Sequence, residues 1–104
     1  MRDILKTLED WRQAGEQIAL ATVVRTSGST PRPKGAAMGI TASGRVAGSV
    51  SGGCLEAAVV EEALEALAAG RPKLVHYGIT EDMAWEVGLS CGGEVDIFVE
   101  PLTW

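Results

Sequence analysis

Apolar and polar positions alternate with a helical period at the start of the chain. Residues 3–14 carry apolar side chains every three or four positions, which predicts an amphipathic helix that ends at Gly15. Residues 18–26 form an almost continuous apolar, β-branched run, typical of a strand that is covered on both faces. Two shorter strand patterns, 36–41 and 45–50, follow around the turn residues Ser43 and Gly44 and predict a hairpin.

The second half of the chain also predicts one helix followed by strands. Residues 54–69 predict a helix closed by Gly70, and residues 73–77 predict a strand. Residues 80–87 read as an irregular or short helical connection, and alternating apolar residues at 95, 97 and 99 predict the last strand. The order α-β-β-β-α-β-β predicts one α+β domain over residues 1–104, with a mixed sheet of about five strands backed by two helices.

Composition and charge narrow the classes of function. The chain has 104 residues and a net charge of −5, which argues against a nucleic-acid partner. It contains no uninterrupted run of about 18 apolar residues, so no membrane span is expected. Charged residues break up its first positions, which argues against a secretory signal. We therefore expect a cytoplasmic protein whose two cysteines are reduced. Glycine is frequent, with 13 residues in short clusters, and the candidate chemistry lies in these clusters.

The first cluster joins a strand to the second helix through paired glycines. Ser51, Gly52 and Gly53 precede a helix start, where free N–H groups and the helix dipole favour an anion. Cys54 lies in the first turn, where the same field favours a thiolate, although a turn with a small buried cysteine explains the pattern equally well. With Gly53 as the N-cap, Glu56 occupies a favoured capping position and is either a cap or a site residue.

Two further clusters have related compositions. Cys91, Gly92 and Gly93 stand just before the last strand and form either a second wall of a pocket or a β-turn with an incidental thiol. The run from Arg25 to Gly35 holds three cations and four hydroxyl residues, which suits either an anion cradle or a solvated loop. Arg32 and Lys34 are its candidate anion-binding side chains, and the glycine spacing excludes a Walker loop.

Metal and hydrolase sites are poorly supported. A zinc site would need Cys54, Cys91 and His76 to converge with a carboxylate, and no Cys-x-x-Cys pair is present. We interpret His76, the only histidine, as a strand residue lodged against the sheet. No pattern indicates a Ser-His-Asp triad, so no catalytic residue is assigned.

Taken together, the three clusters resemble a known family. The runs ATVVRTSGSTPRPKGAAM, GSVSGGCLEAAVVEEA and GLSCGGEVDIFVEP are similar to the XdhC/CoxI family, accessory factors that mature xanthine dehydrogenase and carbon monoxide dehydrogenase. The likeness extends from about residue 5 to residue 101. Many family members continue into a second, Rossmann-like domain, and this chain stops at Trp104. We therefore expect a single XdhC/CoxI-like domain without the C-terminal Rossmann domain.

The resemblance implies a non-catalytic chaperone that binds the molybdenum cofactor (molybdopterin) as cargo, protects it and helps insert it into a xanthine-dehydrogenase-type molybdenum hydroxylase. The implied partners are that apo-enzyme, a cysteine desulfurase, a second copy of the chain and, where the second domain is separate, a Rossmann-type protein. The matching positions are Ser51, Gly52, Gly53, Cys54, Glu56, Cys91, Gly92, Gly93, Arg32 and Lys34. Cys54 and Cys91 are the candidate molybdenum contacts, because soft thiolates suit a soft metal–dithiolene group.

Two other functions remain open from the sequence. A small sulfur-transfer or redox protein would use Cys54 as an activated nucleophile and Cys91 as the resolving thiol. A docking module would use the glycine loops to shape a surface for maturation partners and would bind no small molecule.

Overall fold

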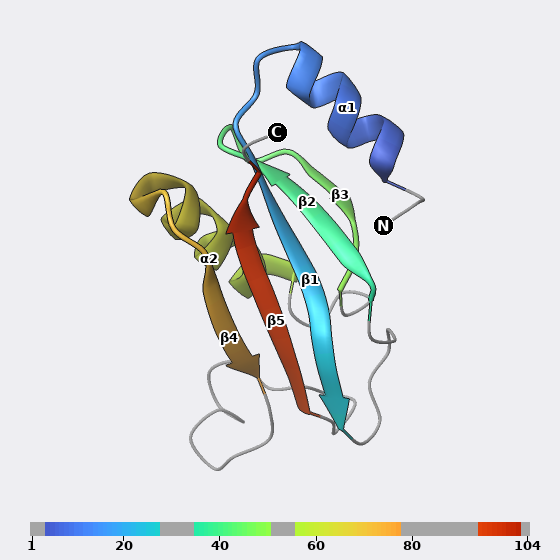
Figure 1. The fold of residues 1–104 in the computed structure, drawn as a ribbon, viewed down its shortest axis with the longest axis vertical. Coiled ribbons are helices and arrows are strands. Elements are labelled where there is room, and N and C mark those ends of the chain that lie inside the picture. Colours follow the sequence, from blue (N-terminus) through green and yellow to red (C-terminus); the bar gives the residue numbers. More distant parts are fainter. Residues whose placement is uncertain (1–3, 28–34, 51–55, 78–93, 103–104) are drawn as a thin grey trace.

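The computed structural model describes residues 4–27, 35–50, 56–77 and 94–102. Figure 1 shows a twisted sheet with two helices; along the chain, one helix precedes the strands and the other lies between the third and the fourth strand. The elements are α1 (Leu5–Gln13), β1 (Ile18–Ser27), β2 (Ala37–Thr41), β3 (Val46–Gly48), α2 (Glu56–Ala69), β4 (Lys73–Tyr77) and β5 (Glu94–Pro101). The predicted α+β class and the predicted element order are confirmed. The expected connection at residues 80–87 lies outside the described residues.

The sheet runs in the order β3-β2-β1-β5-β4, and all four strand pairings are antiparallel. The prediction of a mixed sheet was wrong in this respect. The crossover through α2 leaves β3 and β4 pointing the same way, as such a connection usually does. However, β4 lands at the far edge beside β5, so three strands separate it from β3 and no parallel neighbours arise.

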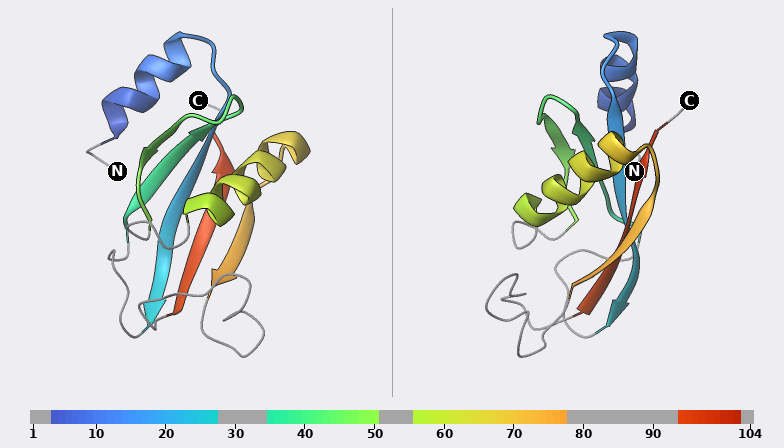
Figure 2. Two further views of the ribbon diagram at one scale, coloured as in Figure 1. Left: turned by 180° about the vertical axis from the view of Figure 1, so that it is seen from behind. Right: turned by 90° about the vertical axis from the view of Figure 1, so that its left-hand side faces the viewer.

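The two helices cover opposite faces of the sheet. Because side chains alternate along a strand, Ala19 and Ala21 of β1 face α2, whereas Ile18 and Leu20 face α1. The α2 face contains the larger apolar core, and its members from α2 are Val59, Ala63 and Ala66. On the α1 face, Ile18 and Leu20 pack with Leu8 and Trp11. Figure 2 shows α2 lying across one face of the sheet. The prediction of a strand covered on both faces is thus confirmed for the first half of β1.

Local hydrogen bonds account for where the elements end. The predicted hairpin closes through the Thr41 N–H, which donates to the Arg45 carbonyl at 2.9 Å, and the Gly44 N–H, which donates to the Thr41 carbonyl at 2.9 Å. At the end of α2 the Gly70 N–H donates to the Ala66 carbonyl at 2.8 Å. Neither α1 nor α2, the helices of the described chain, is long and apolar enough to cross a bilayer.

Candidate functional site

Most of the predicted site residues fall in three stretches, 28–34, 51–55 and 78–93, that lie outside the described residues. These residues are Arg32, Lys34, Ser51, Gly52, Gly53, Cys54, Cys91, Gly92 and Gly93. Their assignment to a site therefore stays a prediction. Glu56 is the predicted site residue that the structure places.

The described residues that flank these three stretches meet at one end of the sheet. Ser27, at the end of β1, pairs with Glu94 at the start of β5, and Tyr77, at the end of β4, pairs with Val95. The Val23 N–H donates to the Ala36 carbonyl at 2.8 Å, which holds the start of β2 against β1. We call this the motif end of the sheet, defined by Ser27, Ala36, Val50, Tyr77 and Glu94. In Figure 1 it is the end at which β1 finishes and β5 begins.

A shared apolar core fixes the motif end. Ala36, Val50, Tyr77 and Val95 are all buried in the same cluster as Val59 of α2. Ala36, Val50 and Val95 each stand within two residues of one of the three predicted motifs. Three motifs that are far apart in sequence thus leave a common core, as convergence on one site requires.

Glu56 ties the first turn of α2 to the segment that follows β3. Its carboxylate oxygen Oε2 accepts hydrogen bonds from the Ser49 hydroxyl at 2.9 Å and from the Val50 N–H at 3.1 Å. Val50 is only 2% exposed, so its N–H has little access to water. A carboxylate in the first turn also interacts favourably with the positive end of the helix dipole. The predicted capping of Gly53 stays a prediction, because Gly53 lies outside the described residues; the contacts that the structure shows are those with Ser49 and Val50.

A charged cluster lies on the face of the sheet opposite α2, and the sequence did not predict it. Arg25 Nε donates to Asp96 Oδ2 at 2.6 Å, and His76 Nδ1 lies 2.5 Å from Asp96 Oδ1. Asp96 is only 15% exposed, and these two partners hold the pKa of its carboxyl below its usual value, with the Arg25 hydrogen bond as the largest cause. His76 lies in a strand, as predicted, but it is exposed and has a carboxylate partner that the sequence did not indicate.

The alternation of β5 could have revealed Asp96, because it places this residue opposite the buried face that carries Val95 and Ile97. The pairing of Asp96 with Arg25 depends on a register shift between Val23 and Arg25, and no sequence pattern predicts this shift.

The lowered pKa of Asp96 predicts an acid-dependent contribution to stability. A carboxyl whose pKa is depressed on folding stabilises the protein above its unfolded pKa of about 3.9, and this stabilisation is lost as pH falls through the folded value. We therefore expect Asp96→Asn to lose less stability than the wild type on acidification below about pH 4. Urea unfolding at a series of pH values measures this difference, and parallel pH profiles for the two proteins would contradict it.

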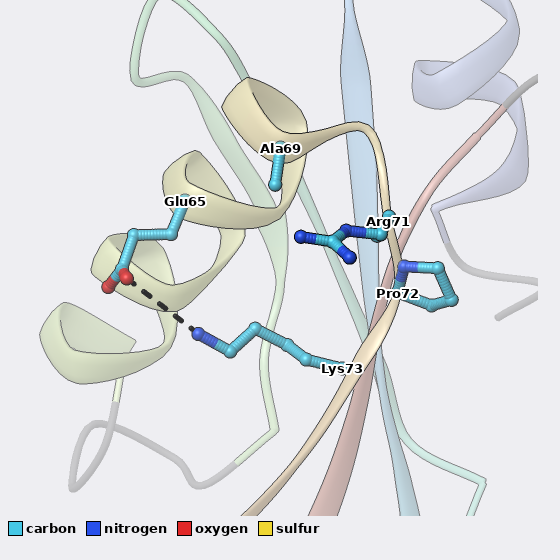
Figure 3. Close-up of a pocket in the computed structure, with 5 residues that line it drawn as sticks. All are labelled: Glu65, Ala69, Arg71, Pro72 and Lys73. Carbon is cyan, nitrogen blue, oxygen red and sulfur yellow. Dashed lines mark ion pairs between the residues drawn. The ribbon is translucent and has the colours of Figure 1, made fainter.

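A hollow of about 320 Å³ lies away from the motif end, beside the last turn of α2. Glu65, Ala69, Arg71, Pro72 and Lys73 line it, as Figure 3 shows. Lys73 Nζ is paired with Glu62 Oε2 at 2.5 Å and with Glu65 Oε1 at 3.8 Å, so its charge is already balanced. In the part of the chain that the structure describes, no three His, Cys, Asp or Glu side chains are grouped to hold a metal ion.

Comparison with known proteins gives consistent matches. The XdhC and CoxI family model matches residues 11–78. The molybdenum cofactor insertion chaperone PaoD of Escherichia coli is 38% identical over 97% of this chain and 31% of its own length. A Bacillus subtilis protein named as a probable xanthine dehydrogenase component is 32% identical over 85% of this chain and 27% of its own length. The chain thus spans less than a third of these curated relatives.

A solved structure shares the fold. The crystal structure described as a xanthine dehydrogenase from Bacillus halodurans superposes with a TM-score of 0.80 at 29% sequence identity. The match covers 95% of this chain and 30% of that one.

Proposed function

The chain belongs to the XdhC and CoxI family, and from this we propose that it takes part in maturation of a molybdenum enzyme by binding the molybdenum cofactor as cargo. In this proposal it protects the cofactor and helps to insert it into a xanthine-dehydrogenase-type hydroxylase. The chain itself catalyses no reaction. The observation that carries the proposal is the convergence of the three motif flanks on one end of the sheet, with Glu56 bracing the segment that leads into α2.

The residue types near the motif end suit the chemistry of this cargo. Molybdopterin carries a phosphate, which backbone N–H groups at a helix start hold well. Its metal–dithiolene end is soft and is matched by thiolates. We propose that Gly52 and Gly53, assisted by Ser51, hold an anionic part of the cofactor, and that Cys54 and Cys91 flank its metal end. Gly92 and Gly93 would allow close approach, and Arg32 and Lys34 would add positive charge.

Glu56 has a positioning role in this proposal. Through its bonds to Ser49 and Val50 it holds the chain after β3 in place before the cargo arrives. Ordering a loop in advance lowers the entropic cost of binding.

The assembly that we propose follows the same logic. A cofactor carrier needs a donor and a recipient, so the chain would contact a cysteine desulfurase and the apo-hydroxylase in the cytoplasm. The proposal includes a homodimer. It also includes a Rossmann-type domain or partner protein, which would supply functions of the relatives that lie outside the third of their length matched by this chain.

Equilibrium binding of isolated molybdenum cofactor tests the proposal directly. The purified protein is mixed with cofactor and ultrafiltered, and the retained pterin is oxidised and measured by fluorescence. We expect stoichiometric binding by the wild type and weaker binding by Cys54→Ala and by Cys91→Ala. Failure of the wild type to bind at cofactor concentrations well above micromolar would refute cargo binding by this chain. Equal affinity of both variants and the wild type would refute only the thiol contacts.

A further inference from the structure

An apolar surface lies on β4 and β5, toward the end of the sheet opposite the motif end. Leu74 of β4 is 62% exposed, the highest value for a large apolar side chain in the part of the chain that the structure describes. It pairs with Phe98 of β5, and both side chains point away from the face that α2 covers. Phe98 also lines a hollow of about 250 Å³ together with Pro72 and Pro101. We call these four residues the apolar patch.

Two charged side chains beside the apolar patch form no ion pair with any described residue. Glu100 lines the hollow, and Arg71 directly precedes Pro72 at its rim. Figure 3 shows the exposed Arg71 guanidinium without an ion pair to the residues drawn, whereas neighbouring Lys73 is joined to Glu65. One cation and one anion without a described partner thus flank the same apolar patch.

This combination of charges makes the surface complementary to itself. In a dimer with two-fold symmetry the same surface occurs on both sides, so a contact between two different residues is made twice. With the axis near the hollow, Arg71 of each protomer faces Glu100 of the other, and the two apolar patches remove each other from water. A partner of one sign of charge would leave either Arg71 or Glu100 unpaired, so a second copy of the chain is the occupant that fits.

We propose that the apolar patch, with Arg71 and Glu100, is the surface through which two copies of this chain associate. This inference rests on the proposed function, whose homodimer it locates, and it does not depend on cargo binding. The surface lies near the start of β4 and the end of β5, whereas the motif end lies at the end of β4 and the start of β5. Association through it therefore keeps the two motif ends clear of the interface.

Charge reversal tests the pairing, with the dissociation constant of the dimer measured by analytical ultracentrifugation over a range of protein concentrations. We expect Arg71→Glu and Glu100→Arg each to raise this constant by about a hundredfold or more, because each change places like charges together twice. An equimolar mixture of the two variants should associate like the wild type, since each contact in the mixed dimer again joins an Arg and a Glu. Lys6→Glu, the same change at an exposed residue of α1, should leave the constant unchanged.

Leu74→Ser tests the apolar part of the surface. The dimer should dissociate about tenfold more readily or beyond that, because each protomer then buries one leucine fewer. Leu5→Ser is the matched control, since Leu5 is 48% exposed on α1, away from the apolar patch. This control variant should keep the wild-type dissociation constant.

The outcomes separate this inference from the proposal on which it rests. A wild-type dimer whose dissociation constant is unchanged by both charge reversals and by Leu74→Ser would overturn this surface and leave the homodimer in place. A mixture of charge variants that stays monomeric, while circular dichroism shows both to be folded, would overturn the contact between Arg71 and Glu100. A wild type that is monomeric at its highest soluble concentration would overturn the surface and the homodimer together. Cargo binding is decided independently, by ultrafiltration with cofactor.

Discussion

Gly48→Ala should lower the free energy of unfolding by about 2–4 kcal/mol, a large fraction of the stability of a domain of this size. Gly48 is the last residue of β3 and has φ +81°, a conformation that costs an L-residue about 1–2 kcal/mol. A Cβ atom there would lie 2.5 Å from the carbonyl oxygen of Ala37 and 2.9 Å from Cγ2 of Ile4.

The contact with the Ala37 carbonyl oxygen accounts for much of the expected destabilisation, because a backbone atom cannot move away without disturbing the sheet. Ile4 is a side chain and can move, but the Ala37 carbonyl belongs to β2, which pairs with both β1 and β3. Moving it would disturb the pairing of Met38 with Gly48. The damage would extend to Ser49 and Val50, so the segment bound by Glu56 should loosen together with the edge of the sheet.

Gly44→Ala isolates the clash. Gly44 has φ +93°, but a Cβ added there meets nothing within 4 Å. This variant should therefore lose only the conformational cost, about 1–2 kcal/mol. Urea unfolding of both variants measures the difference. Equal losses would show that the contact with the Ala37 carbonyl contributes nothing.

Local patterns predicted the fold well because the helices and strands are specified by their own periodicity. The alternation at Val95, Ile97 and Val99 gave the buried face of β5, and Gly15 and Gly70 marked where the two helices end. Strand order depends on which edge a crossover reaches, and this is decided by packing over the whole sheet. The antiparallel neighbours of β4 therefore did not follow from the sequence.

The candidate site was predictable in its residue types and less so in its contacts. The position of Glu56 at a glycine-rich helix start indicated a capping role, because that signal is local. Its bonds to Ser49 and Val50 depend on the path of the chain after β3, and the Arg25–Asp96 contact depends on a register shift in β1. The remaining motif residues, from Arg32 to Gly93, stay predictions.

Glu56→Ala should have the largest combined effect on stability and on cargo binding. Hydrogen bonds to a charged acceptor are worth about 1.5–3 kcal/mol each, and removal of the carboxylate leaves the buried Val50 N–H without this partner. Because two bonds that share one oxygen do not add fully, we expect a loss of about 2–4 kcal/mol in the free energy of unfolding. Glu56→Gln retains a carbonyl acceptor and should lose roughly half as much.

The effect of Glu56 on binding follows from what it holds. If the carboxylate orders the approach to the glycine pair, its removal makes the cargo bear the cost of ordering that segment, and affinity should fall about tenfold or more. Glu65→Ala is the control on the same helix, because Glu65 is exposed and its 3.8 Å ion pair with Lys73 is worth less than about 1 kcal/mol. Cofactor binding by ultrafiltration, at a temperature where all variants are folded, gives the comparison. Equal affinities for Glu56→Ala and Glu65→Ala would make Glu56 a stabilising cap with no part in holding cargo, whereas a loss confined to Glu56 would tie the capping contact to the site.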